Sequence, residues 1–307
     1  MKGRLYLSAL VATVAGTGAH AIDLGLLDDF EGSLPMTCVT DDWAVGIQQV
    51  PNPPIGVVGC GELESCCLVA QSMGGFGPGS RQVVLNETQW SGDYNAAGVN
   101  KIQMQAANAS ATETINLRVG VTNGVTCYVS TDAVILPPSQ PGPGGLVFSS
   151  FLLDSSAMTE VSGNNCPTGG DSLTTVLSGV AQLRLLSSVS PSWLGDAIVS
   201  VLQVDAIESK SDADLDGIND DLDNCTNAAN PNQADSDGDG FGNICDADLN
   251  NDCIVNAGDL GLFKSVFFTA DPDADFNGDG VVNAIDLGAL RVAFFAAPGP
   301  GLGACGD

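Results

Sequence analysis

The stretch from Asp212 to Asp286 contains four copies of one acidic pattern, and these copies decide how the C-terminal third of the chain folds. We number them loop 1 (Asp212–Asp223, DADLDGINDDLD), loop 2 (Asp235–Asp246, DSDGDGFGNICD), loop 3 (Asp248–Asp259, DLNNDCIVNAGD) and loop 4 (Asp275–Asp286, DFNGDGVVNAID). Each has Asp or Asn at positions 1, 3, 5 and 9 and Asp at position 12, and three have Gly at position 6. Such a loop wraps a hard cation, because alternate side chains, the position 7 carbonyl and the last carboxylate all supply oxygens.

These oxygen donors predict calcium as the cofactor. Zinc and copper favour Cys and His clusters, and magnesium favours a tighter octahedron than a wrap of this length provides. The segment from Asp212 to Asp286 contains 18 acidic residues, which repel one another when no metal is bound. We therefore expect residues 210–297 to lose their fixed structure without calcium. The predicted ligands are Asp212, Asp214, Asp216, Ile218, Asp220, Asp223, Asp235, Asp237, Asp239, Phe241, Asn243, Asp246, Asp248, Asn250, Asp252, Ile254, Asn256, Asp259, Asp275, Asn277, Asp279, Val281, Asn283 and Asp286.

Residues 1–21 have the pattern of a secretory signal peptide. Lys2 and Arg4 precede an apolar run, and the segment ends with the small residues of Ala19-His20-Ala21. The apolar run is too short to span a bilayer, which argues against a membrane anchor. We expect cleavage after Ala21 and a secreted protein, extracellular or at the cell surface, with no transmembrane segment in the mature chain.

Cleavage also narrows the chemistry of the mature chain. His20 is the only histidine, so Ser-His-Asp and Cys-His catalysis and His-ligated zinc are excluded. Without Lys2 and Arg4, 37 acidic residues face seven basic ones, a net charge near −30. Such a surface repels nucleic acid and acidic lipid headgroups.

Ten cysteines in an exported chain indicate a disulfide framework. Cys225 and Cys245 flank the segment that joins loops 1 and 2, and we expect them to pair. Cys253 and Cys305 are expected to connect the two ends of the last module. The remaining six allow 15 connectivities; they are Cys38, Cys60, Cys66, Cys67, Cys127 and Cys166.

Residues 22–209 differ from the loops and predict a mainly β domain, an antiparallel β-sandwich. Short runs that alternate between apolar and polar residues recur between Gly, Pro and Asn, as expected of half-buried strands. The Pro- and Gly-rich segment 137–145 is a loop inside this domain, because strand patterns continue on both sides. The runs are 98–104, 115–121, 145–151, 181–186 and 197–204.

The same domain resembles the jelly-roll modules of bacterial secreted proteins, including carbohydrate-binding modules. Asp28-Asp29-Phe30-Glu31-Gly32, Trp43 and the closing strand 201–207 carry this resemblance. It implies that Glu31 and Asp205 share a structural calcium ion. The alternative is that both are charges at the ends of strands.

Residues 210–247, with DADLDGINDDLDNC followed by NPNQADSDGDGFGNICD, resemble a thrombospondin type 3 repeat. The resemblance implies a segment with almost no apolar core, held in shape by calcium and a disulfide. Its folding would then depend on calcium.

Residues 248–297 are a duplication with a 27-residue offset, in which Asn256–Phe268 aligns with Asn283–Phe295. Each copy is expected to be a calcium loop that runs into a short helix, with the final Asp of the loop capping the helix. Apolar residues at helical spacing predict the core between the two helices, whereas Phe268 and Phe295 project outward or cover the ends. The stripes are Leu260, Phe263, Val266 and Phe267, and Leu287, Leu290, Ala293 and Phe294.

This loop–helix pair resembles a dockerin, an EF-hand-like module, which implies a cohesin-like protein at the surface as partner. Two features depart from the pattern. Cys253 replaces Gly at position 6 of loop 3, and positions 10 and 11 are Ala257-Gly258 and Ala284-Ile285 rather than a Ser-Thr type of cohesin contact. The resemblance thus supports the calcium loops better than a conventional cohesin partner. Residues 298–307 remain as a C-terminal tail.

These features favour a calcium-binding protein for non-catalytic binding, adhesion or assembly at the cell surface or on extracellular polysaccharide. A sugar binder needs exposed aromatic rings. Trp90 and Tyr94 are the predicted platform, while Trp43 and Trp193 are equally well explained as core. An assembly protein should instead expose an apolar patch on the paired helices.

The alternative function is polysaccharide degradation, because a glycoside hydrolase needs only two carboxylates and no histidine. None of the available acids lies in a recognisable catalytic motif, and no catalytic residue is assigned. The candidates in the first domain are Glu31, Glu62, Glu64, Glu87, Glu113 and Glu160.

Overall fold

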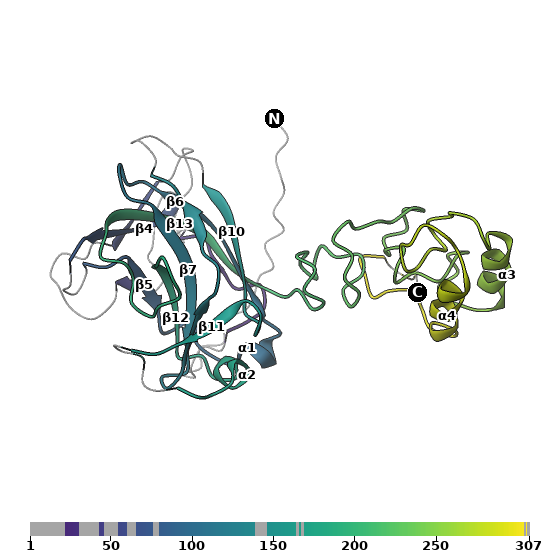
Figure 1. The fold of residues 1–307 in the computed structure, drawn as a ribbon, viewed down its shortest axis with the longest axis horizontal. Helices are drawn as coiled ribbons and strands as arrows, with labels where there is room; N and C mark the ends of the chain where they lie inside the picture. The colour runs from purple at the N-terminus through teal and green to yellow at the C-terminus, as the bar shows by residue number, and fades with distance from the viewer. Residues whose placement is uncertain are drawn as a thin grey trace, which may run out of the picture.

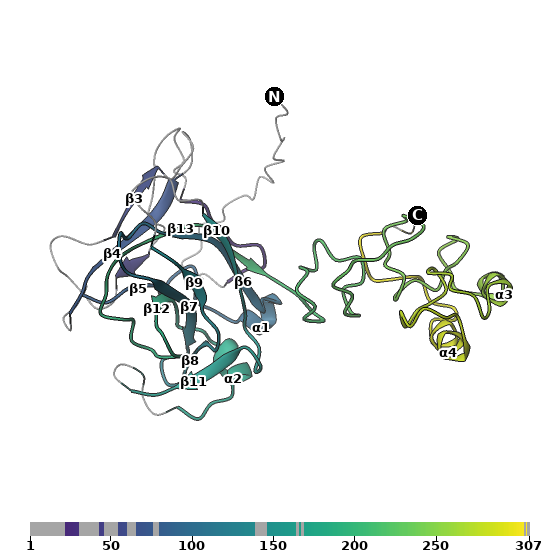
Figure 2. The same ribbon diagram turned by 45° about the horizontal axis from the view of Figure 1, so that its top comes forward.

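The computed structural model describes residues 22–30, 43–45, 55–59, 66–75, 80–138, 146–163, 166, 169–303 and 305. A β-sandwich ends at Lys210 and is followed by a C-terminal region (residues 211–303) made of turns and two helices. Figures 1 and 2 show this region projecting from one side of the sandwich, with the helices α3 and α4 at its far end. Among the described helices, none is long and apolar enough to cross a bilayer.

Two antiparallel sheets form the sandwich, so the prediction of a mainly β fold is confirmed. The first sheet has the order β10-β6-β13-β4-β3, with β1 beside β13, and the second has the order β11-β8-β7-β12-β5-β2, with β9 beside β7. The strands of the first sheet are β1 (Leu27–Asp28), β3 (Ile55–Gly59), β4 (Cys66–Met73), β6 (Lys101–Asn108), β10 (Val147–Leu152) and β13 (Val199–Lys210). Those of the second are β2 (Ala44–Val45), β5 (Val83–Asn86), β7 (Ile115–Thr122), β8 (Cys127–Ser130), β9 (Val134–Leu136), β11 (Met158–Val161) and β12 (Gln182–Ser187).

The alternating runs of the sequence correspond to β6, β7, β10, β12 and β13. The segment 137–145 lies between β9 and β10, as expected of a loop inside the domain, although residues 139–145 are outside the described ones. Two short helices were not predicted: α1 (Tyr94–Ala97) and α2 (Leu173–Leu177). Each is too short to show helical periodicity, and each begins at a side-chain cap, Asp93 or Ser172.

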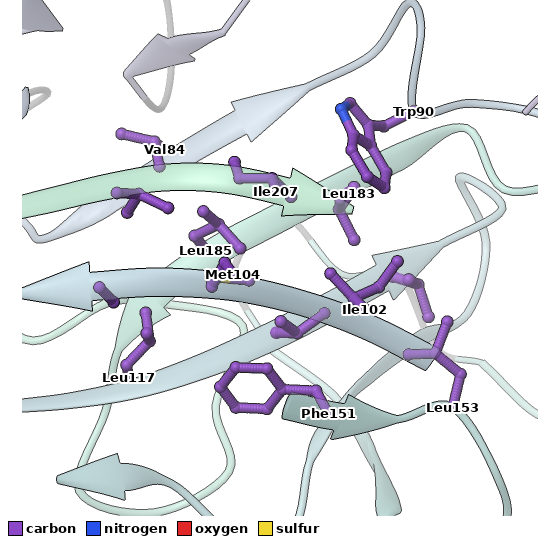
Figure 3. Packing of buried hydrophobic residues seen from close by; sticks show 14 of the residues in the cluster. Val84, Trp90, Ile102, Met104, Leu117, Phe151, Leu153, Leu183, Leu185 and Ile207 are labelled. Atoms are coloured by element: carbon purple, nitrogen blue, oxygen red, sulfur yellow. The ribbon is translucent and has the colours of Figure 1, made fainter. Parts of the chain in front are cut away.

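One apolar core fills the space between the sheets (Figure 3). Ile102 and Met104 of β6 face Leu117 of β7 and Leu183 and Leu185 of β12, and all five side chains are buried. Burying one such side chain contributes about 1.5–3 kcal/mol. The sandwich therefore has a hydrophobic core of its own.

The predicted aromatic platform is wrong, because Trp90 and Tyr94 are both fully buried. The carboxylate of Asp28 accepts the indole N–H of Trp90 at 2.6 Å and that of Trp43 at 2.7 Å. Burial raises the pKa of Asp28, although these hydrogen bonds lower it. Trp43 and Trp193 are buried as well, in line with the core interpretation. The shared acceptor explains why the rings of Trp90 and Trp43 turn inward.

The duplicated unit folds into helices α3 (Ala257–Ser265) and α4 (Ala284–Val292). Their N-caps are Asn256 and Asn283 at loop position 9, so the expectation that the final Asp caps the helix is wrong. Asp259 and Asp286 instead lie in the first helical turn. There each accepts the backbone N–H of its N-cap residue, which completes a capping box.

The apolar stripes of α3 and α4 form the core of this unit as predicted, around the buried Phe263 and Leu290. Position 8 of each loop pairs with the end of the other copy's helix. The carbonyl of Val255 accepts the N–H of Phe295 at 2.8 Å, and that of Val282 accepts the N–H of Phe268 at 2.8 Å. The rings of Phe268 and Phe295 project outward, with 77% and 78% of their surface exposed.

Candidate metal sites in the four loops

All four loops fold around the carboxylate at position 1. Its Oδ2 atom accepts the backbone N–H of position 6, at 3.1 Å in loops 1 and 2 and 2.7 Å in loop 4, and the same bond joins Asp248 to Cys253 in loop 3. The carboxylate at position 5 accepts the N–H of position 7 at 2.8–3.2 Å. The other oxygen of the position 1 carboxylate, Oδ1, accepts the N–H of position 5 in loops 1, 3 and 4 and that of position 4 in loop 2, so this side chain holds the backbone of each loop around it.

The turn at position 6 requires a left-handed backbone in every loop. Gly217, Gly240 and Gly280 have φ of 100°, 96° and 87°, values that favour glycine. Cys253 takes the same place in loop 3 with φ of 69°. The missing glycine therefore does not alter the loop, and the disulfide to Cys305 holds the residue there.

Loops 1 and 2 bring their carboxylates together. One oxygen each from Asp212, Asp214 and Asp216 lie within 4.8 Å of one another, and the same holds for the Asp residues at positions 1, 3 and 5 of loop 2. In loops 3 and 4 position 3 is an Asn, whose side-chain oxygen accepts the N–H of position 5 at 2.9 Å. The position 3 side chain therefore accepts the position 5 N–H in all four loops.

Three buried carboxylate oxygens of the loops have no hydrogen-bond partner among the described residues: Oδ2 of Asp214, Oδ2 of Asp223 and Oδ1 of Asp259. Asp223 and Asp259 stand at position 12 of loops 1 and 3 and are 1% and 0% exposed. Leaving a buried anionic oxygen unpaired is costly, and native proteins rarely do so. A bound cation is the partner that fits these oxygen-only sites.

Burial and mutual repulsion raise the pKa values of several loop carboxyls. The pKa of Asp246 is raised to about 7 by burial and by the charges of Asp239, Asp237 and Asp248. Burial likewise raises the pKa of Asp214, which also lies near the charges of its own loop. The fold therefore concentrates negative charge that only protons or a cation can relieve.

Position 9 has a structural task in every loop. Asp220 and Asn243 accept the backbone N–H of position 2, at 2.8 and 2.9 Å, whereas Asn256 and Asn283 cap the helices. The side-chain N–H groups of these two Asn residues also donate to the position 7 carbonyls of their own loops at 2.8 Å. Metal ligation remains a prediction for all the loop positions, including 7 and 9.

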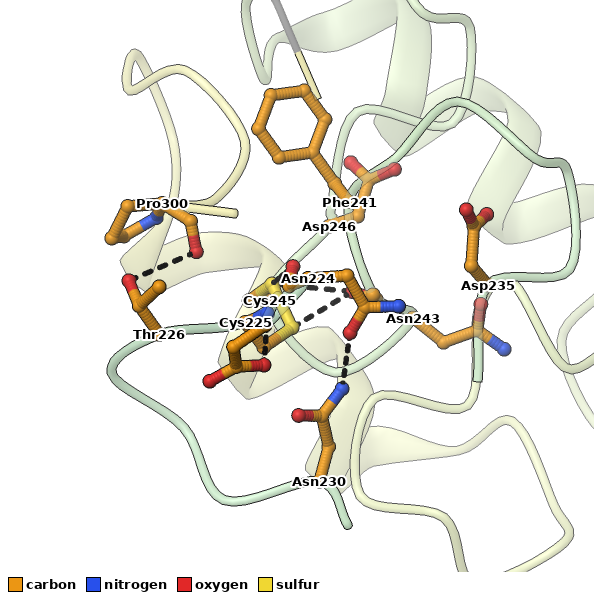
Figure 4. The surroundings of a disulfide bond; sticks show 12 residues. Asn224, Cys225, Thr226, Asn230, Asp235, Phe241, Asn243, Cys245, Asp246 and Pro300 are labelled. Atoms are coloured by element: carbon orange, nitrogen blue, oxygen red, sulfur yellow. Dashed lines mark hydrogen bonds between the residues drawn. A yellow bond between two sulfur atoms is a disulfide. The ribbon is translucent and has the colours of Figure 1, made fainter. Parts of the chain in front are cut away.

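The disulfide predictions for the C-terminal region are confirmed: Cys225 pairs with Cys245, and Cys253 with Cys305. Figure 4 shows the first of these bridges next to Asn224, whose side chain accepts a 2.6 Å bond from Asn230. In the sandwich Cys127 pairs with Cys166, a choice the sequence left open. Cys38 and Cys60 lie outside the described residues.

The C-terminal tail packs onto loop 2 and the segment before it, a contact that was not predicted from the sequence. The N–H of Thr226 donates to the carbonyl of Pro300 at 3.1 Å, and Figure 4 shows these two residues side by side. Gly299 and Gly303 lie against the ring of Phe241. A Cβ on Gly301 would overlap the carbonyl oxygen of Asn224, and one on Gly303 would overlap the Phe241 ring. The alternating glycines of 299–303 were the available signal.

A second feature missed by sequence reasoning is the junction where loop 1 meets strand β6 of the sandwich. Asn100, Lys101 and Gln103 all bond to loop 1. A pocket of about 380 Å³ lies here, lined by Lys101, Gly217, strand β10 and the turn between β8 and β9. Nothing in the local sequence marks these residues, because the contact joins segments more than 100 residues apart.

The remaining predicted sites lie in the sandwich. Glu31 is outside the described residues; Asp205 is buried on β13, and its carboxylate accepts the N–H of Ala206 at 2.7 Å. Their shared calcium ion therefore stays a prediction. Glu62 and Glu64 are also outside the described residues. The other candidate acids are exposed and lie in separate parts of the fold: Glu87 follows β5, Glu113 lies between β6 and β7, and Glu160 is in β11.

No protein-family model matches the chain, and no curated protein matches it. Among solved structures, it is similar to a family 11 carbohydrate-binding module from Clostridium thermocellum, at 14% identity and a TM-score of 0.39, over 61% of this chain and 96% of the module. An exo-β-agarase is 13% identical, with a TM-score of 0.36, over 62% of this chain and 25% of the agarase. A second agarase is 12% identical, with a TM-score of 0.34, over 78% of this chain and 32% of the agarase. At such TM-scores these likenesses are too remote to assign a function.

Proposed function

We propose that the chain is a secreted calcium-binding protein that acts in non-catalytic binding or assembly, at the cell surface or on extracellular polysaccharide. Calcium in loops 1–4 stabilises the C-terminal region, which carries the interaction surface, while the sandwich binds the polysaccharide. The observation that carries the calcium proposal is the buried, unpartnered carboxylate oxygens of Asp214 and Asp223 in loop 1 and of Asp259 in loop 3.

The residues present fit calcium in number and chemistry. Each loop offers only oxygen donors, and the loops wrap far enough for about seven ligands. The position 1, 3, 5 and 12 side chains would hold the ion, which supplies the positive charge that these carboxylates lack. The likeness of 210–247 to a thrombospondin type 3 repeat and of 248–297 to a dockerin supports the same assignment.

Calcium titration of the full mature chain tests this proposal. We expect about four ions per chain with dissociation constants of roughly 10⁻⁴–10⁻³ M or tighter. Chelation should abolish the amide-exchange protection of residues 211–303 and leave that of the sandwich unchanged. Equal protection of the C-terminal region with and without chelator would contradict the proposal.

The assembly role is supported by apolar surface that the paired helices leave uncovered. Phe268 and Phe295 occupy equivalent places in the two copies, and both have left-handed backbones, with φ of 65° and 69°. Such a backbone disfavours a bulky side chain, so exposing a ring there twice is not explained by folding alone. Ile285 and Val292 of α4 are 63% and 88% exposed and extend the apolar surface.

Polysaccharide binding is supported by the pocket at the junction. Ser130, Asp132 and Ser150 line it together with Phe151 and Leu152, so a few polar groups stand beside apolar walls. This combination suits a sugar unit, because its hydroxyl groups bond to polar side chains and its C–H face packs on apolar ones.

Adsorption to a panel of insoluble polysaccharides, with assay of released reducing ends, separates the two functions of the sandwich. We expect binding without release of sugar, and loss of binding in Ser150→Trp, which fills the pocket. Ser155→Trp is the control, because Ser155 is exposed and does not line the pocket. Release of reducing ends would favour the degradative alternative, and equal binding by both variants would place the ligand elsewhere.

A further inference from the structure

Strand β6 and the residue before it hold loop 1 through three side chains. The Asn100 side chain donates to the Asp212 carbonyl at 2.7 Å and accepts the Asp212 N–H at 2.9 Å. Gln103 and Asn219 exchange two side-chain amide bonds of 2.9 and 3.0 Å. Both members of this amide pair are 7% exposed, so the two segments meet in a buried interface and not in a surface contact.

Lys101 lies at the centre of this interface and is 2% exposed. Its ammonium donates to Oδ2 of Asp212 at 3.0 Å and to the carbonyl of Gly217 at 2.9 Å. A buried lysine is tolerated only when it is paired. Loop 1 thus provides the carboxylate and the carbonyl that pair the ammonium of Lys101. Separation of loop 1 from β6 would change the surroundings of both Lys101 and Asp212.

The same bonds fix which oxygen of Asp212 faces the acidic cluster. Oδ2 is occupied by Lys101 and by the N–H of Gly217, whereas Oδ1 receives a single 3.1 Å bond from the Asp216 N–H. Within the described part of the chain, Asp212 is the one position 1 carboxylate that pairs with a lysine. Loop 1 differs from the other loops in this respect.

We infer that Asn100, Lys101 and Gln103 are positioning residues of the first calcium site, so that calcium binding by loop 1 and docking of loop 1 on β6 are linked. Calcium closes the loop into the shape that β6 recognises, and β6 orients the Asp212 carboxylate for the ion. Because linkage is reciprocal, each event strengthens the other by the same factor. Occupancy of loop 1 would then set how the C-terminal region is carried on the sandwich.

Acetylation of lysines, followed by mass spectrometry, tests the docking in the full chain. Lys101 is buried and Lys264 is exposed, so Lys264 serves as an internal control for the reagent. In calcium we expect Lys101 to react slowly in the unmodified protein and at least about tenfold faster in Asp214→Asn, which removes a ligand without touching β6. Asp237→Asn, the equivalent change in loop 2, should leave Lys101 protected.

The effect of docking on calcium binding is tested with a residue of the sandwich that is not a calcium ligand. Gln103→Ala should weaken calcium binding at one of the four sites by about the same tenfold factor. Gln105→Ala is the matched control, because Gln105 lies two positions further along β6, is exposed and belongs to no hydrogen bond with loop 1 among the described residues.

The inference rests on the proposed calcium binding by the loops. The outcomes must therefore distinguish a failure of the linkage from a failure of calcium binding. If four ions bind but Lys101 stays protected in Asp214→Asn and Gln103→Ala binds calcium normally, the linkage is wrong and calcium binding stands. If no ion binds and Lys101 is equally protected in chelator, both are wrong. Fast labelling of Lys101 in Asp214→Asn, with weakened binding in Gln103→Ala, would establish the linkage.

Discussion

The sandwich and the C-terminal region are held together by different forces. In the sandwich, 29 described apolar residues form one buried cluster between two hydrogen-bonded sheets, whereas the corresponding cluster of the C-terminal region has seven. That region also contains no described strand, so many of its backbone N–H groups bond to carboxylates and side-chain amides instead.

The difference shows which interactions stabilise the C-terminal region in place of a large apolar core. Carboxylates that satisfy backbone groups in a small space are buried and repel one another, and the pKa of Asp246 is raised to about 7 by burial first and by this repulsion second. We therefore expect this region to be stable only when positive charge enters the loops, with the disulfides restricting the unfolded chain and the packing of the tail stabilising the folded one. We expect the sandwich to remain folded without these aids.

The largest expected effect comes from removing a disulfide in each region. Loop closure alone predicts a loss of about 3–4 kcal/mol for either bridge, slightly more for the sandwich bridge, which spans 39 residues against 20. We expect the opposite order of outcomes: Cys225→Ser with Cys245→Ser should lose the exchange protection of residues 211–246, while Cys127→Ser with Cys166→Ser should keep the sandwich protected.

This experiment is read by amide exchange in calcium, peptide by peptide. The sandwich variant retains its buried cluster, whereas the variant of the C-terminal region loses one of few constraints. If the sandwich instead lost protection and loops 1 and 2 kept theirs, core size would not be the property that separates the two regions.

The second prediction concerns pH in the chelated protein. The pKa of Asp246 in the fold is raised to about 7 from an ordinary value of 3.8, so the folded region binds a proton that the unfolded one releases. Its stability must therefore rise as the pH falls through 7, by about 2–3 kcal/mol between pH 8 and pH 5. Calcium binding should weaken over the same range, because protons compete for the carboxylate.

Amide exchange of the chelated chain at pH 5 and pH 8, corrected for intrinsic rates, measures this effect: we expect no protection of residues 211–303 at pH 8, as in the chelation test, and partial recovery at pH 5. Asp246→Asn, which cannot titrate, is the control and should remove most of the difference. Protection that decreases toward pH 5 in the chelated protein would show that loop repulsion does not limit the stability of this region.

The sequence predicted what is encoded locally. Each acidic loop places its oxygen donors within one short segment, and each strand shows its alternation within its own length, so the turns of the loops and the strands could be predicted without long-range information, whereas calcium binding stays a prediction. The orientation of Trp90 could not, because it depends on Asp28, a carboxylate 62 residues away. The same holds for Lys101, whose partner Asp212 is 111 residues further along. Polar contacts between distant segments leave no periodic signal.

The helix caps illustrate a different limit. Asn256 and Asp259 are both good N-terminal residues, and each is three positions from the other, as a capping box requires. Both candidates were visible in the sequence, and the choice of the second as the cap shifted the predicted start of the helix by three positions.

The smallest expected effect tests whether the tail is part of what replaces a core. Gly301→Ala would make a Cβ overlap the carbonyl oxygen of Asn224, so the tail must move off the segment that joins loops 1 and 2, at a cost of about 1–3 kcal/mol. Gly288→Ala is the matched control in α4, where a Cβ meets nothing within 4 Å and helix propensity favours alanine by about 1 kcal/mol.

Thermal unfolding in calcium, followed by amide exchange of residues 224–245, measures both variants. We expect Gly301→Ala to lower the stability of this segment and Gly288→Ala to raise that of the helix pair, with the sandwich transition unchanged in both. If Gly301→Ala were neutral, the tail would merely rest on loop 2, and the disulfides and the ions alone would hold the C-terminal region together.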